Sequence, residues 1–414
     1  AIVGFSLIDG GAQPNSAFVV ARMKPFADRT GVGDTVQLYD STGNDALAML
    51  PGQAVYKLSG GRVSNAVGFT QNIAFSTGGF DYADIYDSTG DDVASIWSDR
   101  VMMSGGGYTN DARGFDLTAA HSWSSGYDRA NYYDSAGDDL FASWSNRAQM
   151  TGAGYTNHAD GFEKTVAAAT AGGVDRATLN DTAGDDVFTA WFNRATFTGA
   201  GLNYEVQGFD EVTAQSTTGY DQAFLSDSAG NDLLTAWFDR VALTGTGFDN
   251  EARGFDLAQA FATGGGYDEA TLYDSTGDDN FIGGPARGVM FGAGYYNIAQ
   301  GFERCVAQAT AGGYDRAVLY DSNGNDTVTT TQFTARVRGP GGNFDNQVNN
   351  FEQVTANLVN GGTNVMNIAA TDFIFNMFGQ TSSVASTALA SAAANALVTP
   401  QSASELASNI GARV

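Results

Sequence analysis

An acidic turn recurs along the chain at a nearly constant step, and this period constrains the fold more than any other feature. The turn has the form Asp-Ser/Thr-x-Gly-Asp/Asn-Asp, as in DSAGDD at 134–139. Successive copies of its glycine are 47, 47, 47, 46, 47 and 47 residues apart, at Gly43, Gly90, Gly137, Gly184, Gly230, Gly277 and Gly324. Copies in phase indicate a repeat architecture, in which each unit packs on its neighbours.

Two further columns keep the same step. An aspartate opens each unit, at Asp34, Asp81, Asp128, Asp175, Asp221, Asp268 and Asp315, and a Gly-Phe pair ends in Phe69, Phe115, Phe162, Phe209, Phe255 and Phe302. Short alternating stretches such as DLFASW, RAQMTG and FEKTVAA are typical of strands separated by turns. Arg129 to Arg147 spans 18 residues and Arg147 to Arg176 spans 29, which we interpret as two unequal coils. The sequence therefore predicts an all-β protein, a parallel β-helix or β-solenoid of about seven 47-residue repeats with two coils each.

The period divides the chain into three parts. Residues 34–379 form the predicted solenoid, with a degenerate last repeat at 361–379. Residues 1–33 lack the turn but hold apolar, strand-like stretches, and we interpret them as a terminal cap or assembly segment. Residues 380–414 are rich in Ala and Ser, which predicts a short α-helical tail. Because the chain begins AIVGFSLIDG, without methionine or a signal sequence, we expect a processed product or a trimmed chain.

Composition restricts the partners of such an array. The 414 residues include 46 Asp and Glu against 20 Lys and Arg, which gives a formal net charge of −26. Nucleic acid binding requires a basic surface, so we exclude it, and metal cations are the natural counterions. No apolar run reaches the roughly 18 residues that a membrane span needs. The single cysteine, Cys305, excludes an internal disulfide framework and is expected to be a small buried residue.

Two roles are open for the acidic turn. Carboxylates and carbonyls are the hard oxygen ligands that Ca²⁺ requires, so one turn could hold this ion. Alternatively, Asp and Asn favour tight turns because their side chains accept nearby backbone N–H groups. The last aspartate of the motif never varies, whereas the residue before it is Asp or Asn, so the last one is the stronger candidate for either role. The candidate metal-binding residues are Asp40, Asp45, Asp87, Asp91, Asp92, Asp134, Asp138, Asp139, Asp181, Asp185, Asp186, Asp227, Asp232, Asp274, Asp278, Asp279, Asp321 and Asp326.

The second half of the turn resembles a known calcium-binding repeat. Gly-Asp-Asp-x-Phe at 137–141 and Gly-Asn-Asp-x-Leu at 230–234 are similar to the G-x-D-x-U core of the RTX, or hemolysin-type, repeat. The resemblance implies a parallel β-roll whose glycine-rich turns hold Ca²⁺ between adjacent coils, each of two nonapeptides. This chain departs from that pattern because the nonapeptide does not recur in tandem, and Gly152 and Asn157 replace the acidic residues in the longer coil. Acidic turns would then face each other only at every second coil, about 9.6 Å apart.

The aromatic and basic columns are expected to be structural. The Phe column and the tryptophans Trp97, Trp144, Trp191 and Trp237 admit sugar binding, but core packing is the simpler interpretation. The arginines Arg129, Arg147, Arg176, Arg194 and Arg316 are expected to pair with acidic columns. An enzyme would need a break in the repeat that carries a carboxylate pair or a carboxylate beside Arg or Lys. The carboxylates instead recur in phase with the repeat, so we expect no catalytic activity. The insert HSWSSG, with His121 and Trp123, is the one place where we would look for a site.

The ends of a solenoid suggest its function. Each end is a layer of unpaired strand edges, which recruit another chain unless they are capped. Here the end segments are apolar and nearly uncharged, and a contact between two different ends need not close, so it produces filaments. We therefore expect a secreted structural protein that assembles head to tail into an extracellular filament or surface layer. The alternative is a calcium-dependent, RTX-like adhesin that acts as a monomer on cell-surface glycans, and a polysaccharide-active enzyme is the third interpretation.

Overall fold

The predicted fold class is confirmed: the chain is an all-β solenoid. The computed structural model describes residues 2–4, 19–22, 34–379 and 383–384, and in this part the only helical element is the short 3-10 turn η2, Pro340–Gly342. The chain forms two compact units. Unit 1 comprises Ala1–Ser228 and Asp239–Ala258, and unit 2 comprises Ala229–Phe238 and Gln259–Val414. Each unit is described by itself.

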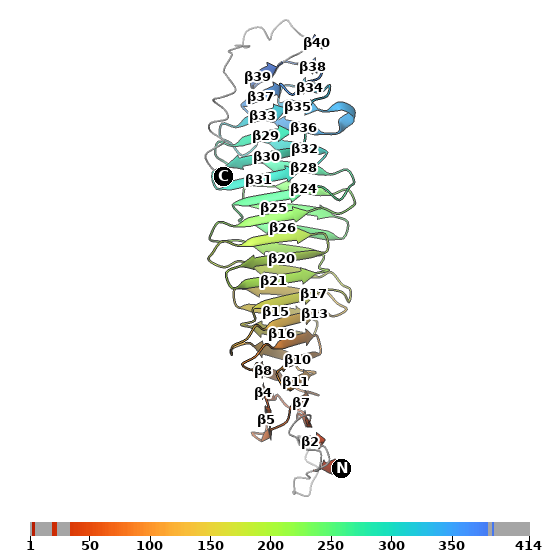
Figure 1. The fold of residues 1–414 in the computed structure, drawn as a ribbon, viewed down its shortest axis with the longest axis vertical. Coiled ribbons are helices and arrows are strands. Elements are labelled where there is room, and N and C mark those ends of the chain that lie inside the picture. The colour runs from red at the N-terminus through yellow and green to blue at the C-terminus, as the bar shows by residue number, and fades with distance from the viewer. Residues whose placement is uncertain (1, 5–18, 23–33, 380–382, 385–414) are drawn as a thin grey trace. The chain divides into compact units, whose positions relative to one another are not determined.

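Unit 1 consists of stacked strands (Figure 1). They are β1 Ile2–Gly4, β2 Val19–Arg22, β3 Thr35–Tyr39, β4 Ala46–Leu50, β5 Gln53–Lys57, β6 Val63–Val67, β7 Gln71–Phe75, β8 Tyr82–Tyr86, β9 Val93–Trp97, β10 Arg100–Gly105, β11 Tyr108–Arg113, β12 Leu117–His121, β13 Arg129–Tyr133, β14 Leu140–Trp144, β15 Arg147–Gly152, β16 Tyr155–Asp160, β17 Lys164–Ala168, β18 Arg176–Asn180, β19 Val187–Trp191, β20 Arg194–Gly199, β21 Leu202–Gln207, β22 Glu211–Gln215, β23 Gln222–Ser226, β25 Arg240–Gly245 and β26 Phe248–Arg253.

Unit 2 has the same organisation. Its strands are β24 Leu233–Ala236, β28 Glu269–Tyr273, β29 Asn280–Gly284, β30 Arg287–Gly292, β31 Tyr295–Gln300, β32 Arg304–Gln308, β33 Arg316–Tyr320, β34 Thr327–Thr330, β35 Thr334–Arg338, β36 Asp345–Asn349, β37 Gln353–Leu358, β38 Val365–Asn367, β39 Ile374–Gly379 and β40 Ser383–Val384. The remaining strand, β27 Leu257–Phe261, falls at the boundary between the two units.

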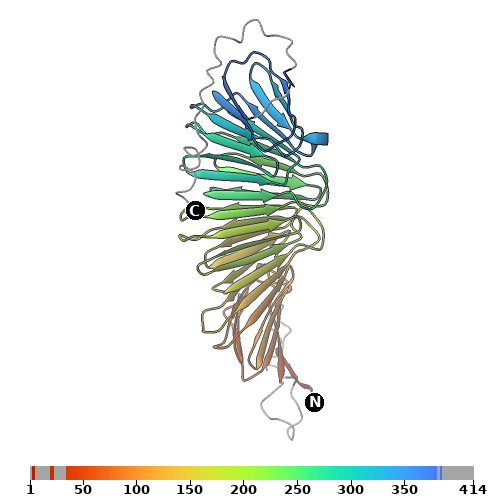
Figure 2. The same ribbon diagram turned by 45° about the horizontal axis from the view of Figure 1, so that its top comes forward.

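Each repeat contributes five strands, and successive repeats exchange sides. In unit 1 we name the sheet with β9–β11 sheet A and the sheet with β14–β16 sheet B. Strands β9, β10 and β11 form an antiparallel meander in sheet A, β12 crosses to sheet B, and β13 returns to sheet A. The next meander, β14–β16, lies in sheet B instead, and the one after, β19–β21, lies in sheet A again. The structure therefore repeats only after two sequence repeats. Figure 2 shows the stacked strands from a second direction.

The expected division of the repeat into coils of 18 and 29 residues is wrong. Arg129 and Arg147 begin strands in different sheets, and β15 runs antiparallel between β14 and β16. Two-residue connections at 145–146 and 153–154 make these reversals, and Gly154 has the left-handed φ of 83° that such a tight turn requires. Within unit 1, parallel neighbours are instead 35 residues or more apart, as in the pairing of Arg129 with Lys164.

The core lies between the two sheets of each unit. Strands bury alternate residues, so that Tyr132 of β13 and Phe141 of β14, on opposite sheets, place their ring centroids 5.5 Å apart. Most of the Phe column is buried, as expected: Phe115, Phe209, Phe255 and Phe302. The tryptophan column is not core, because Trp144 and Trp191 stand at outward-facing positions of their strands and are exposed. Cys305 is buried as predicted, and burial raises the pKa of its thiol to about 12.

A column of buried polar residues, mostly asparagine, joins a repeat to the one before it. Asn110 Nδ2 donates to the carbonyl of Leu50 at 3.1 Å, and Asn157 Nδ2 donates to the carbonyl of Trp97 at 2.9 Å. In the fourth repeat the Tyr204 hydroxyl makes the corresponding bond, to the carbonyl of Trp144. Because buried polar groups need partners, each bond fixes the register of one repeat on its predecessor. Asn157, which departs from the calcium-binding pattern in the sequence, therefore has a structural role.

The two end segments are described only in part. The predicted α-helical tail at 380–414 lies outside the described residues except for β40, and the predicted cap at 1–33 lies outside them except for β1 and β2. The degenerate last repeat forms β38 and β39, and Asn364 takes the place of the opening aspartate by accepting the N–H of Asp326 at 2.9 Å.

Candidate metal centre

The last aspartate of each motif is buried and closes its own turn. Asp139 Oδ2 accepts the backbone N–H of Ser135 at 2.7 Å and the Ser135 hydroxyl at 2.9 Å, while Oδ1 accepts the Tyr155 hydroxyl at 2.8 Å. The same backbone N–H bond, from the Ser or Thr four residues earlier, is made to Asp45, Asp92, Asp186, Asp279 and Asp326. Both oxygens of Asp139 face donors, so a carboxylate is required there. This explains why aspartate is found at position 139.

The middle residue of the motif binds the end of its own repeat with one oxygen. Asp138 Oδ1 accepts the N–H of Val174 at 2.8 Å, and Asn44 Oδ1 accepts the N–H of Phe80 at 3.0 Å. Asp91, Asp185 and Asp278 make the same bond. An asparagine oxygen serves this purpose as well as a carboxylate oxygen, which explains the alternation of Asp and Asn.

The first aspartate of the motif also bonds the turn at the end of its own repeat. Asp134 Oδ2 accepts the N–H groups of Thr170 and Ala171 at 2.8 and 2.7 Å. Equivalent bonds from backbone N–H groups reach Asp40, Asp87, Asp181, Asp274 and Asp321. All of these, and also Asp227 and Asp232, are buried or nearly so. Each motif is therefore a set of acceptors that fastens its own turn and the turn stacked beside it at the end of the repeat.

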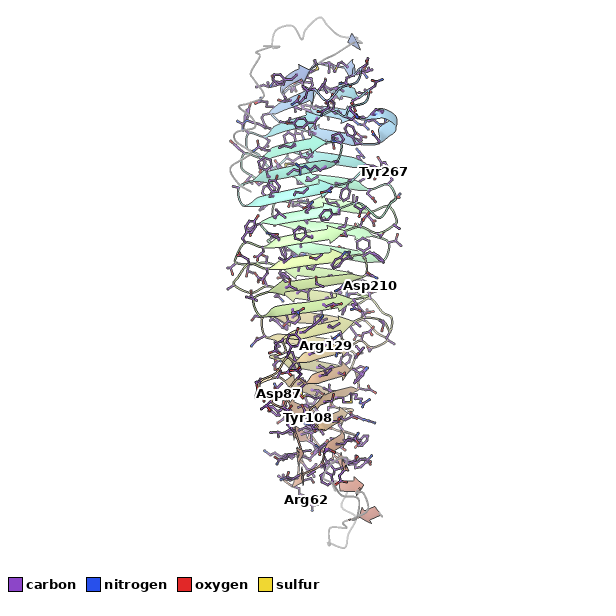
Figure 3. The ribbon with its side chains drawn as sticks, viewed as in Figure 1. Arg62, Asp87, Tyr108, Arg129, Asp210 and Tyr267 are labelled. Carbon is purple, nitrogen blue, oxygen red and sulfur yellow. The ribbon has the colours of Figure 1, made fainter. Side chains whose placement is uncertain are left out.

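Sequence reasoning did not include the opening aspartates among the site residues, although it identified their column. The N–H of Asp139 donates to Asp175 Oδ1 at 2.9 Å, and the N–H of Asp175 donates to Asp210 Oδ2 at 2.9 Å. Similar pairs follow along both units, and Figure 3 marks Asp87 and Asp210, which belong to these acceptor columns. The acid that follows the Gly-Phe pair in the second to sixth repeats, such as Asp210, was the sequence signal that could have identified this acceptor column.

Three opening aspartates complete groups that could hold a metal ion within a single unit. In each group one oxygen from every carboxylate lies within 4.8 Å of the others, and all three residues are buried. Unit 1 holds Asp40 with Asp45 and Asp81, and Asp134 with Asp139 and Asp175, while unit 2 holds Asp274 with Asp279 and Asp315. Clustered carboxylate oxygens are the donor set of a hard cation such as Ca²⁺ or Mg²⁺.

The electrostatics of these groups favour neutralisation. Burial, followed by the charges of its neighbours, raises the pKa of Asp315 to about 6 despite the backbone N–H that it accepts. Burial also raises the pKa of Asp81 and of Asp175, with the nearby motif aspartates adding to the effect. Desolvation and like charges both penalise the ionised form, and either a proton or a bound cation would relieve the penalty.

The second and fourth repeats differ from this arrangement. Their motif and opening aspartates do not come within 4.8 Å of one another as a group. In the fourth repeat Asp186 Oδ1 is buried without a hydrogen-bond partner, and the tyrosine that serves Asp139 in the third repeat is replaced by leucine at 202. Such an orphaned oxygen is rare and costly, and Asp92 Oδ1 in the second repeat is orphaned in the same way, so these two turns are less satisfied than the turn of Asp139.

Of the five arginines, Arg147, Arg176 and Arg194 pair with strand acids and not with the turn aspartates. Arg129 donates to Asn131 Oδ1 and Arg316 donates to the carbonyl of Tyr314. Arg176 Nε lies 2.7 Å from Glu211 Oε2, and Arg194 Nε lies 2.9 Å from Glu205 Oε1. These pairs join neighbouring strands on the outer faces, where ion pairs contribute little. The expected pairing with the repeated acidic columns is therefore correct only for acids within strands.

Comparison with known proteins assigns no family. No protein-family model matches the chain, and a search of the curated proteins finds no match. In the described part of the chain, no helix has the length and apolar character needed to cross a membrane. The solenoid and its acidic groups are compatible with an RTX-like fold.

Proposed function

We propose that the protein is a non-catalytic structural repeat protein of the cell exterior that assembles end to end into filaments or a surface layer. The observation that carries the proposal is the outer edge of β6, which is an edge strand of sheet B in unit 1. In the part of the chain that the structure describes, β6 pairs only with β5.

Every later strand of the same kind in unit 1 has a partner at that edge. The third strand of each meander pairs in parallel with a strand of the preceding repeat, as in β11 with β7, β16 with β12, β21 with β17 and β26 with β22. The first repeat has the meander but no described strand to fill this position. Its outward residues Val63 and Val67 are 61% and 64% exposed, so the edge is apolar as well as unpaired.

We assign this position to a second copy of the chain. In unit 2 the last long strand, β39, pairs in parallel with β37 and exposes Ile374, Met377 and Phe378. Contact between two different ends is heterologous and propagates without closing, which produces a filament. The net charge of −26 keeps the faces soluble, so association is confined to the ends.

Electron microscopy and light scattering of the purified full chain test the proposal. The double variant Val63→Lys, Val67→Lys places charges on the edge and is expected to abolish filaments while leaving the solenoid folded. Val174→Lys is the matched control, because Val174 is 43% exposed in unit 1 but lies in a turn between paired strands. Filaments that form equally with both variants would refute assembly through β6.

Deletion of residues 380–414 tests the contribution of this segment to assembly separately from that of β6. If the tail contributes to the joint, the truncated protein is expected to remain folded, by circular dichroism, and monomeric. Filaments from the truncated chain would remove the tail from the joint but would leave the role of β6 to the lysine variants.

The three carboxylate groups favour a second candidate, a calcium-stabilised, RTX-like module that acts as a monomer at a surface. The same measurements in about 5 mM Ca²⁺ and in EDTA distinguish the candidates, since that concentration exceeds weak extracellular affinities. Filaments that persist in EDTA support the structural role and reduce the aspartates to turn formers. Monomers that fold only with Ca²⁺ support the alternative.

A further inference from the structure

The insert in the second repeat creates an unusual cluster on the outer face of sheet B. Tyr86, His121, Asp160 and Arg147 lie directly opposite one another on four adjacent strands, β8, β12, β16 and β15. The corresponding positions of the other repeats hold uncharged residues, namely Phe75, Ala168, Gln215, Phe261 and Gln308, in place of His121. The cluster is therefore not a requirement of the repeat.

His121 is held between two carboxylates and an aromatic ring. Its Nε2 lies 3.3 Å from Asp84 Oδ1 and its Nδ1 lies 3.4 Å from Asp160 Oδ2, while its ring stacks on Tyr86 with centroids 4.9 Å apart. Burial lowers the pKa of His121, but the bonds and charges of Asp160 and Asp84 outweigh it and raise the pKa to about 9. The imidazole is therefore a cation at neutral pH.

Arg147 completes the charges of the cluster. Its Nε lies 3.5 Å from Asp160 Oδ1, and its Nη2 lies 2.7 Å from His158 Nδ1. Burial and the charge of Arg147 lower the pKa of His158, so this imidazole is neutral and accepts the bond. The charges of His121 and Arg147 thus balance those of Asp84 and Asp160.

Trp123 covers this balanced cluster and projects into solvent. Its ring centroid is 4.4 Å from that of His121 and 5.3 Å from that of Tyr86, yet the residue is 66% exposed. In the equivalent position Thr77 donates its N–H and hydroxyl to Asp40, and Thr217 does the same to Asp181. In the second repeat an exposed indole replaces the threonine, so this hydroxyl bond is absent. The requirements of folding do not explain the replacement.

We propose that Trp123, Tyr86 and the balanced charges beside them form a binding site for a neutral oligosaccharide. An exposed indole offers a flat apolar surface for the apolar face of a sugar ring. Asp84, Asp160 and Arg147 retain side-chain exposures of 32%, 24% and 45%, so carboxylate acceptors and a guanidinium donor are available to sugar hydroxyls. Because the four charges cancel, the site does not select a charged ligand, although the chain as a whole has a net charge of −26.

Isothermal titration of the full chain with cellohexaose, maltohexaose, mannohexaose and chitohexaose tests the proposal. At least one is expected to bind with a dissociation constant on the order of 1 mM or tighter. Trp123→Thr introduces the residue that stands at this position in repeats such as those of Thr77 and Thr217, and its hydroxyl can donate to Asp87, so the variant is expected to fold at least as stably. Because it lacks the indole, it is expected to lose at least about tenfold in affinity. Trp123→Tyr keeps an aromatic ring and is expected to retain binding within roughly threefold.

Trp191→Thr is the matched control, because Trp191 is an exposed tryptophan on sheet A of the same unit. Binding that this variant retains and Trp123→Thr loses supports the site. The proposal is overturned if none of the four oligosaccharides binds at about 10 mM. Binding that survives Trp123→Thr, or a preference for oligolysine or oligogalacturonate over all four neutral sugars, overturns it as well.

Discussion

The clearest prediction concerns two adjacent aspartates that the sequence treats differently. Asp139→Asn is expected to destabilise the solenoid strongly, whereas Asp138→Asn is expected to have almost no effect. The two substitutions make the same chemical change one residue apart. They differ only in what the carboxylate oxygens contact.

The magnitude follows from the hydrogen bonds. Asp139 uses Oδ2 for Ser135 and Oδ1 for Tyr155, and it is 2% exposed. Asparagine retains one of these acceptors and turns an NH₂ group toward a donor in a buried site. Loss of a charge-assisted bond and an unsatisfied group together cost roughly 3 kcal/mol. Asp138 is exposed and uses one oxygen, which asparagine reproduces, so its cost is below about 0.5 kcal/mol.

Urea denaturation, followed by far-UV circular dichroism and by tryptophan fluorescence, measures both variants. Two probes are needed because repeat arrays do not always unfold in one step. Equal losses for the two variants, or a loss below about 1 kcal/mol for Asp139→Asn, would refute the hydrogen-bond argument. Repeating the series in EDTA separates turn formation from metal binding, since the difference persists without metal only if the aspartate acts through these bonds.

Three further predictions test the same interpretation. A Cβ at Gly199 would lie 1.4 Å from Asp186 Oδ1, so Gly199→Ala is expected to lower the melting temperature. Gly106 has open space around it, so Gly106→Ala is expected to leave the melting temperature nearly unchanged. Leu202→Tyr offers the orphaned Asp186 oxygen a hydroxyl and is expected to stabilise the protein by about 1 kcal/mol in urea denaturation; a loss would show that the phenol does not reach it. His121 has a raised pKa of about 9, so its stabilisation is complete below its ordinary value of 6.5 and is lost as the pH rises through about 9. Stability measured from pH 6 to pH 10 should therefore fall by up to about 3 kcal/mol more in the wild type than in His121→Gln.

The period and the turn chemistry could be read from the sequence because they are local. Glycine and Asp-Ser pairs fix a turn within a few residues, and their regular recurrence indicates stacking. The invariance of the last motif aspartate, as in Asp139, also identified the residue with the most internal bonds. The hairpin at 145–146 was missed because the alternation of apolar residues is the same for a strand that continues in parallel and one that reverses.

Sequence alone therefore determined that this chain is a β-solenoid of in-phase repeats with acidic corners, since composition, period and turn residues act over short distances. Only the tertiary structure decided which sheet each meander joins, which carboxylates come within reach of one another, and which aromatic residues face solvent. Asp134 and Asp175 are 41 positions apart in sequence and yet belong to one buried group. The physical reason is that five strands per repeat carry each successive repeat to the opposite sheet, so a single sequence column alternates between the two faces of the protein.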